Sequence, residues 1–290
     1  RASWDADELS LYGRFDFILA KDGTPKILEF NADTPTSLLE ASVIQWQWKE
    51  DVFPECDQFN GIHEGLVQSW KDIFPKKGEI HFAGALENNE DTGTLQYLAS
   101  TAMEAGFSTR VLDMQALDLQ NGRFFDPAGE LVNRCFKLYP WEWMVDESPD
   151  GCLAEMEWLE PIWKLVMSNK AILATLYELF PDSPYVLPCY LSRPRSGLFC
   201  KKPVFSREGH NVSVVDIRDW EEYVRIAETE GDYNTGAYVY QEYVEPTVYS
   251  GRYPVIGSWI IGGEAVGIGI RENRMEVTDN LSEFVPHIIG

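Results

Sequence analysis

The chain has 290 residues, of which 44% are hydrophobic and 13% aromatic, enough to bury a sizeable core in one or two domains. Its 24 lysine and arginine residues stand against 47 aspartate and glutamate residues, a formal net charge of −23. This acidic excess argues against binding to nucleic acid or to an anionic membrane, because basic residues supply the affinity for phosphate groups. The composition indicates a globular protein whose acidic surface is compatible with cationic substrates or metal ions.

The cysteines and the apolar runs bear on the compartment. The five cysteines form no C-x-x-C pair and are odd in number, which favours reduced thiols in a cytoplasmic protein. No apolar run approaches the ~18–20 residues of a membrane span, and no signal-peptide pattern is present. The chain begins at Arg1 rather than at a methionine, and we expect that an N-terminal segment is missing. The pattern predicts no particular oligomeric state.

Residues 13–31 hold the most informative pattern, two β-rich runs joined by Asp22-Gly23. An Asp-Gly pair between such runs is typical of a two-residue type I′ turn, which needs positive φ at both central positions. A turn of this length fixes the pairing of the two strands. The predicted cross-strand pairs are Lys21 with Thr24, Asp16 with Glu29, and Arg14 with Asn31.

The last two pairs share one face of the hairpin, because strand side chains alternate between faces. The other face is expected to join the core, with Phe15, Phe17, Leu28 and Phe30. Two opposed carboxylates have Cβ atoms about 5 Å apart and repel each other unless a cation lies between them.

Carboxylates and an Asn amide oxygen are ligands of the kind that Mg²⁺ takes, and a neighbouring arginine holds a phosphate or carboxylate well. The alternative is a solvated polar face on an amphipathic hairpin. We favour the metal, because the two acids oppose each other with no lysine among them. Removal of either acid is then expected to abolish Mg²⁺-dependent turnover and, by relieving repulsion, to raise stability by up to about 1 kcal/mol.

The next elements predict a parallel sheet. Helices are expected over residues 36–48 and 59–72. They precede a strand at 79–86, a helix at 92–105 that Gly106 terminates, and a strand at 108–112. This order is a βαβ unit. The loop 87–92 follows its first strand, at the edge where open α/β sheets bind ligands.

The second half of the chain turns from helices to strands. Helices are expected after Glu160-Pro161 and from Ser168 to Leu179. The expected strands cover residues 198–203, 211–215, 237–244, 255–261 and 264–271.

Lys202 ends the first of these strands and is followed by a Ser-Arg-Glu-Gly loop ending at Gly209. Glycine loops bring backbone N–H groups close to phosphate oxygens, and a lysine on the preceding strand adds a charge. The sequence is not a Walker A motif, and a plain hairpin is the alternative. Together with the acidic face, the loop favours a nucleotide site, which needs both a phosphate cradle and magnesium.

Two later strands end in polar groups. Gln241-Glu242 interrupts an apolar strand, where such groups meet an adenine edge and ribose hydroxyls, although an edge strand would look similar. Arg271 and Arg274 end the following strand and are candidate anion binders. No nucleophile elbow and no Cys–His pair supports covalent catalysis.

Several longer motifs run in a fixed order from residue 12 toward the C-terminus. They are Tyr12-Gly-Arg-Phe-Asp-Phe, Leu28-Glu-Phe-Asn-Ala-Asp-Thr-Pro-Thr-Ser-Leu, Gln45-Trp-Gln-Trp, Lys137-Leu-Tyr-Pro-Trp-Glu-Trp-Met, Ser168-Asn-Lys-Ala, Lys202-Pro-Val-Phe-Ser-Arg-Glu-Gly, Ile256-Gly-Ser-Trp and Gly267-Ile-Gly-Ile-Arg-Glu. In these motifs the chain resembles the glutathionylspermidine synthase family, in its ATP-grasp synthetase part. It is more similar still to shorter bacterial members, provisionally described as acid–amine ligases, that lack the amidase domain.

This resemblance implies an α+β or α/β architecture, the ATP-grasp fold, with an inserted Rossmann-like βαβ (pre-ATP-grasp) domain. The magnesium residues precede the nucleotide lysines, which implies the permuted arrangement of eukaryotic glutathione synthetase. The implied domains are 1–75 as part of the ATP-grasp core, 76–160 as the βαβ substrate domain, and 161–290 as the nucleotide-binding lobes.

The resemblance also assigns residues. The implied Mg²⁺ ligands are Asp16, Glu29 and Asn31, and the implied catalytic residues are Arg14 and Arg271. The implied ATP contacts are Arg14, Asp16, Lys170, Lys202, Ser206, Arg207, Gly209, Gln241, Glu242, Tyr243 and Val244. Glu90 and Asp91, in the loop after the βαβ strand, are candidates for binding a cationic amine, with an exposed loop as the alternative.

The implied activity is an ATP- and Mg²⁺-dependent ligation of a carboxylate to an amine through an acyl phosphate, with two Mg²⁺ ions. The acid would be a peptide or an amino acid, and glutathione is one candidate. A polyamine is a candidate for the amine. Three alternatives stay open: a kinase-like phosphotransferase that stops at the acyl phosphate, a non-catalytic ATP- and Mg²⁺-binding protein, and a metal-binding module.

Overall fold

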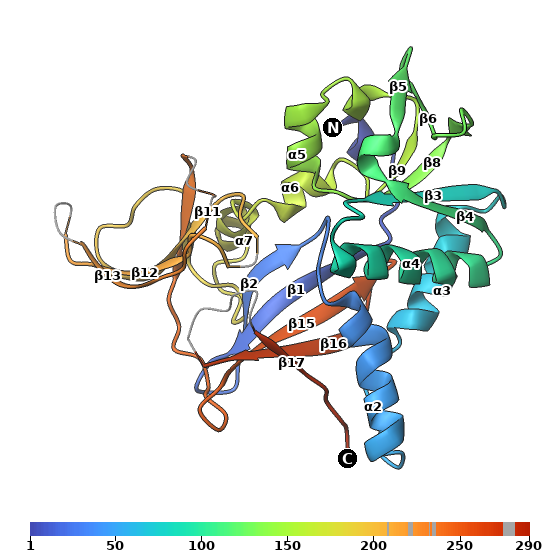
Figure 1. The fold of residues 1–290 in the computed structure, drawn as a ribbon. Coiled ribbons are helices and arrows are strands. Elements are labelled where there is room, and N and C mark those ends of the chain that lie inside the picture. The colour runs from blue at the N-terminus through green and yellow to red at the C-terminus, as the bar shows by residue number, and fades with distance from the viewer. Residues whose placement is uncertain (208, 220–222, 232, 234–235, 275–281) are drawn as a thin grey trace.

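The computed structural model describes residues 1–290 except 208, 220–222, 232, 234–235 and 275–281 (Figure 1). An antiparallel sheet of five strands, in the order β17-β16-β15-β1-β2, lies at the centre of the molecule. It combines two strands from the beginning of the sequence with three from its end. Its strands are β1 (Tyr12–Leu19), β2 (Pro25–Asn31), β15 (Tyr253–Ile261), β16 (Glu264–Asn273) and β17 (Glu283–Val285).

The predicted pairing of the β1–β2 hairpin is confirmed where it matters for the polar face. Asp16 lies opposite Glu29, and Arg14 lies opposite Asn31. The register then shifts by one residue, so that Phe17 pairs with Ile27 and leaves Leu28 as a β-bulge.

The predicted two-residue turn is wrong, and with it the pairing of Lys21 with Thr24. Ala20 N–H donates to the Thr24 carbonyl at 3.0 Å, so the turn contains three residues. Within it, Gly23 takes a φ of +82°, while the Asp22 carboxylate accepts the Thr24 N–H at 2.9 Å. A three-residue turn of this kind needs positive φ at its last position only. The turn is one residue longer than predicted, and this shifts the strand pairing by one residue. The bulge at Leu28 shifts it back by one residue, so the predicted pairs of Asp16 and Arg14 are kept.

The two faces of the hairpin are buried differently from the prediction. Arg14 and Asp16 are only 4% and 2% exposed, whereas Phe15 and Phe30 stack with ring centroids 4.0 Å apart and stay half-buried. Arg14 and Asp16 on the polar face are thus more deeply buried than the two phenyl rings on the other face.

A second sheet is antiparallel, in the order β10-β14-β11-β12-β13. Three of its strands were predicted, β11 (Gly197–Pro203), β12 (Ser213–Ile217) and β14 (Tyr238–Glu242), and two were not, β10 (Cys189–Tyr190) and β13 (Tyr223–Glu228). Helix α7 (Ile172–Leu179) packs on it through Leu173 and Ala174, which contact Val239.

The predicted βαβ unit is confirmed. Strands β3 (Glu79–Gly84) and β4 (Ser108–Asp113) are parallel and flank helix α4 (Asn89–Glu104). Two further strands, β8 (Arg134–Leu138) and β9 (Glu157–Leu159), complete a parallel sheet in the order β4-β3-β8-β9.

Helix α4 begins earlier than predicted. The Asn88 side chain accepts the Glu90 N–H at 2.9 Å and caps the helix at its first turn. Glu90 and Asp91 therefore lie in the first turn of a helix and not in a loop.

Helices α3 (Ile62–Ile73) and α4 lie between the central sheet and the parallel sheet (Figure 1). The largest core cluster forms there, with Trp70, Phe82, Phe136 and Trp259 among its buried members. The helix predicted over 36–48 instead contains a π-helical turn, Glu40–Ile44, that continues into α2 (Gln45–Val52).

The other elements are short. They are α1 (Ala2–Asp5), α5 (Trp141–Glu147), α6 (Lys164–Ser168), the 3₁₀ turns Met114–Ala116 and Gly151–Leu153, and the strands β5 (Asp118–Gln120), β6 (Arg123–Phe125) and β7 (Leu131–Val132). Among the described residues, no helix has both the length and the apolar character needed to cross a bilayer. The five cysteines, which all lie among the described residues, form no disulfide bond.

Candidate nucleotide and metal site

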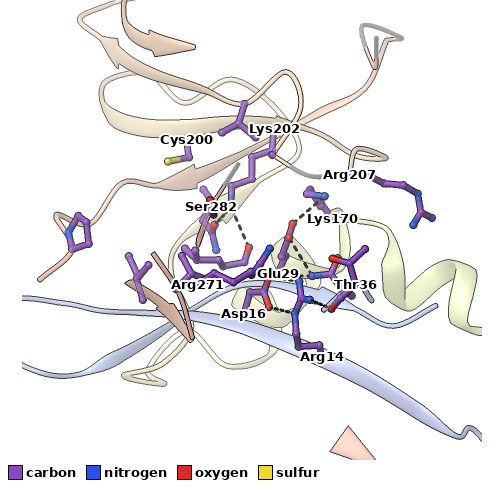
Figure 2. Close-up of a pocket in the computed structure, with 18 of the residues that line it drawn as sticks. Arg14, Asp16, Glu29, Thr36, Lys170, Cys200, Lys202, Arg207, Arg271 and Ser282 are labelled. Atoms are coloured by element: carbon purple, nitrogen blue, oxygen red, sulfur yellow. Dashed lines mark hydrogen bonds and ion pairs between the residues drawn. The ribbon is translucent and has the colours of Figure 1, made fainter. Parts of the chain in front are cut away.

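A pocket of about 220 Å³ lies between the central sheet and the second sheet (Figure 2). Of the residues predicted for the site, only Ser206 and Asp91 are not among those that line it. The predicted residues in its wall are Arg14, Asp16, Glu29, Asn31, Glu90, Lys170, Lys202, Arg207, Gly209, Gln241, Glu242, Tyr243, Val244 and Arg271. Segments more than 200 residues apart in the chain thus meet in one cavity.

Asp16 is the centre of a buried charge cluster at the floor of the pocket (Figure 2). The Arg14 guanidinium donates to both its oxygens, Nε to Oδ1 at 2.6 Å and Nη2 to Oδ2 at 2.9 Å. Arg271, on β16, donates to Oδ2 at 2.7 Å. Burial and the neighbouring Arg14 charge lower the pKa of Arg271. One carboxylate therefore holds two guanidinium groups together, which is a geometry suited to binding a further anion.

Glu29, opposite Asp16, pairs with a lysine from another part of the chain. Lys170, which lies just before α7, places its Nζ 3.0 Å from the Glu29 carboxylate. Burial would raise the pKa of Glu29, but the charges of Lys170 and Lys202 outweigh it and lower that pKa to about 2. Glu29 is thus neutralised by a lysine that the local sequence does not place beside it, whereas Asp16 is neutralised by Arg14 on its own strand and by the distant Arg271. The alternative of a solvated polar face is therefore wrong.

The residues predicted to bind Mg²⁺ fit that ion. The Asn31 amide nitrogen lies 3.2 Å from an oxygen of Asp16 and 3.2 Å from an oxygen of Glu29, so the three side chains converge on one point. A rotation of the amide would present three oxygens there. The described residues contain no group of three or more His, Cys, Asp or Glu side chains with metal-binding geometry. Mg²⁺ needs only one or two carboxylates when substrate phosphates supply the other ligands.

Two buried lysines face the pocket. Lys170 Nζ donates to the Ser206 carbonyl at 2.7 Å, which ties the lysine to the glycine loop. Lys202 Nζ donates to Gln241 Oε1 at 2.7 Å and to the Leu28 carbonyl at 3.1 Å. Each ammonium group is therefore oriented by fixed acceptors.

The glycine loop reaches across the pocket through Arg207. Its guanidinium donates to Thr34 Oγ1, directly after β2, and to Glu142 Oε1 at 2.7 Å, on α5. Gly209 takes a φ of +70°, a value that glycine adopts without strain. Residue 208 of the predicted loop lies outside the described residues.

Apolar side chains form a further part of the pocket wall. This apolar wall was not predicted, because its residues lie on separate strands and loops: Ile18, Leu28, Leu187, Val212 and Val255. Sequence reasoning also missed Thr34, Thr36 and Ser37. The run of small hydroxyl residues directly after β2 is the signal that would have indicated them.

Two solved structures share the fold over nearly the whole chain. A protein of Methylobacillus flagellatus, provisionally named a gamma-glutamylcysteine synthetase, matches 99% of this chain and 82% of its own with a TM-score of 0.65. A glutathione synthetase-like effector of Globodera pallida matches 100% of this chain and 83% of its own with a TM-score of 0.60. Both are 10% identical in sequence. The chain therefore shares its overall fold with these two proteins.

The family follows from the sequence comparisons. Residues 1–290 match the family model described as glutathionylspermidine synthase preATP-grasp, and the chain belongs to that family.

Three curated relatives illustrate the family. A Haemophilus influenzae protein, provisionally named an acid–amine ligase, is 39% identical over 98% of this chain and 76% of its own length. Trypanothione synthetase of Crithidia fasciculata is 28% identical over 98% of this chain. The bifunctional glutathionylspermidine synthetase/amidase of Escherichia coli is 26% identical over 100% of this chain. The chain spans 48% and 51% of those two enzymes. The names of these relatives are those of ligases.

Proposed function

We propose that this chain is an ATP- and Mg²⁺-dependent ligase that joins a carboxylate to an amine through an acyl phosphate. The observation that carries the proposal is the convergence, in one pocket, of the Asp16–Glu29–Asn31 face with two buried lysines and two guanidinium groups. Such a set of hard oxygen donors and cations suits a magnesium–nucleotide complex.

The two ends of the pocket have different tasks in this proposal. Gln241 to Val244 and the apolar wall hold the base and ribose. Lys170 and Lys202 contact the phosphates as fixed positive charges. Asp16, Glu29 and Asn31 would hold two Mg²⁺ ions, which neutralise charge on the phosphates when they are bound.

Phosphoryl transfer then needs mainly positioning and charge neutralisation. A carboxylate oxygen of the acid attacks the γ-phosphorus, the bond to the β-phosphate oxygen breaks, and ADP leaves. Arg14 and Arg271, held together by Asp16, neutralise the negative charge that the acid and the phosphoryl group bring together. The amine nitrogen next attacks the acyl carbon, loses a proton, and phosphate leaves with one former carboxylate oxygen.

The glycine loop closes the pocket in this scheme. Arg207 joins the loop to Thr34, which lines the pocket, and to Glu142 on α5. A closed loop excludes water, which would otherwise hydrolyse the acyl phosphate.

The relatives' names support glutathione or a similar peptide as the acid and a polyamine as the amine. Glu90 lines the pocket from the first turn of α4, whereas Asp91, its neighbour, does not. We therefore assign contact with the cationic amine to Glu90 rather than to Asp91. The net charge of −23 is consistent with a cationic substrate.

Release of ADP in the presence of Mg²⁺ tests the proposal. The protein is incubated with ATP and a pool of peptides and amino acids, with a pool of polyamines, and with both. Turnover that needs both pools is the expected result, and mass spectrometry then identifies the amide. Turnover with the acids alone would establish the kinase-like alternative instead. Binding of Mg²⁺–ATP without turnover in any mixture would favour the non-catalytic alternative.

A further inference from the structure

Four charged side chains outside the pocket are almost completely buried. Their exposed fractions are 1% for Asp33, 0% for Lys137, 0% for Glu160 and 2% for Lys164. They form two ion pairs, Lys137 Nζ to Asp33 Oδ1 at 2.7 Å and Lys164 Nζ to Glu160 Oε2 at 3.6 Å. Charged residues are rarely buried to this extent.

The first pair connects the site hairpin to the parallel sheet. Asp33 follows Asn31 by two residues, and Lys137 lies on β8. The second oxygen of Asp33 accepts the Trp141 N–H at 2.8 Å, at the start of α5. Lys137 also donates to the Tyr139 carbonyl at 2.9 Å. The chain leaving β2 is thus bonded to both β8 and α5.

The second pair is bonded to the other strand of the hairpin. Glu160 Oε1 accepts the backbone N–H groups of Leu11 and Tyr12 at 3.0 and 3.1 Å. Lys164 Nζ donates at 2.9 Å to the carbonyl of Tyr12 and at 2.9 Å to that of Ala32. The network therefore holds β1 two residues before Arg14 and β2 one residue after Asn31.

Stability alone does not account for these charges. Burial lowers the pKa of Lys137 and of Lys164 and raises that of Glu160, so the surroundings disfavour the ionised forms. Replacing a buried ion pair by apolar residues is often neutral or stabilising. Directional bonds from a charged group to several backbone atoms do, however, fix the relative orientation of the segments they join.

The segments joined here carry the two halves of the proposed reaction. β8 is bonded to β3, where Leu138 pairs with Gly84, and β3 leads into α4 with Glu90 in its first turn. The hairpin carries the acidic face. The Asp33–Lys137 contact is thus a short physical link between the phosphate end of the pocket and the residue assigned to the amine.

We propose that Asp33 and Lys137 are positioning residues that fix the hairpin relative to the βαβ unit, so that the acyl phosphate forms within reach of the amine. This inference rests on the proposed function. It predicts that loss of the pair leaves nucleotide binding intact and separates ATP consumption from amide formation.

The test compares the Asp33→Asn/Lys137→Gln double variant with wild type. Both charges are removed together, because removal of one leaves the other buried and unpaired. We expect the dissociation constant of Mg²⁺–ATP to change less than about twofold, and kcat for amide formation to fall about tenfold or more, since small misplacements of reacting groups cost rates of this size. The ratio of ADP to amide is expected to rise above one.

A matched control is Arg134→Gln/Glu157→Gln. This pair, 2.8 Å apart, joins β8 to β9 and lies outside the pocket and the buried network. We expect it to keep the wild-type ratio of ADP to amide. A merely structural role of Asp33 and Lys137 would lower the thermal midpoint while the ratio at a temperature well below that midpoint stays at the wild-type value, and that result would overturn the inference.

If the double variant does not fold, Asp33→Glu replaces it, since it keeps the charge and moves the carboxylate by one methylene. A raised ratio of ADP to amide in folded Asp33→Glu protein supports the inference, and an unchanged ratio contradicts it. Wild-type protein that makes no amide from any pool overturns the proposed function, and this inference with it. If wild type and variant both release one ADP for each amide formed, this inference alone is overturned and the proposed function stands.

Discussion

The Nζ atom of Lys202 lies 3.1 Å from the carbonyl oxygen of Leu28, the residue that forms the bulge in β2. A bulged residue is released from the regular strand pairing, which leaves its carbonyl available to a side chain. Gln241 completes the arrangement, because its Oε1 accepts from Lys202 while its Nε2 donates to the Ile27 carbonyl at 2.8 Å. The irregular position of the hairpin thus orients a lysine of the second sheet.

Substitution of Lys202 by methionine is predicted to weaken ATP binding. The variant loses a buried charge that is aimed at the phosphates, and charged hydrogen bonds contribute about 1.5–3 kcal/mol each. We expect the dissociation constant of Mg²⁺–ATP to rise about tenfold or more in a calorimetric titration.

The neighbouring lysine provides the control for that experiment. Lys201 points to the other face of β11, with its Nζ 3.8 Å from the centre of the Tyr238 ring, and does not line the pocket. Lys201→Met should bind Mg²⁺–ATP as wild type does. Equal weakening by both substitutions would show that net charge, and not the position of Lys202, determines the affinity.

Asp16→Ala is predicted to destabilise the protein, contrary to what the sequence alone indicates. Cross-strand repulsion suggests that loss of one acid is stabilising. The structure predicts the opposite change in stability, because the variant leaves the buried guanidinium groups of Arg14 and Arg271 without their shared carboxylate. Breaking a buried ion pair costs about 3–5 kcal/mol. Urea unfolding of the Mg²⁺-free protein measures the difference, and a variant as stable as wild type would refute the assigned geometry.

Glu29→Gln is predicted to have a pH-dependent effect on stability. The pKa of Glu29 is lowered to about 2 in the folded protein, so its ionisation stabilises the fold above its ordinary pKa and this contribution is lost as the pH falls toward 2. The stability difference between wild type and Glu29→Gln should therefore be largest near neutral pH and shrink below pH ~4. Urea midpoints of both proteins at several pH values give the result. A difference that grows on acidification would have the wrong sign.

Much of the site was predictable because local patterns determine it. Alternation of side chains placed Arg14 and Asp16 on one face, and the cross-strand partners of both were predicted correctly. The turn length was not predicted correctly, because an Asp-Gly pair is compatible with both a two-residue and a three-residue turn. The pairing of the flanking strands determines which of the two forms. The bulge at Leu28 has no local signal at all.

What the sequence could not predict are contacts between distant segments. Arg271 lies beside Asp16 only because β16 and β1 join one sheet on either side of β15. Lys170 lies beside Glu29 only because the segment before α7 packs against the hairpin. The ion pair of Asp33 with Lys137 joins residues 104 positions apart. Periodicity and turn signals describe single elements, whereas these contacts depend on how whole elements pack.

Transfer of oxygen from the acid to phosphate tests the central claim most directly. The acid found in the substrate screen, with glutathione as the first probe, is labelled with ¹⁸O in its carboxylate groups and incubated with ATP, Mg²⁺ and the amine. An acyl phosphate requires that one labelled oxygen leave with the phosphate, so the account predicts singly labelled phosphate in proportion to the amide formed. Amide formation with unlabelled phosphate would contradict it.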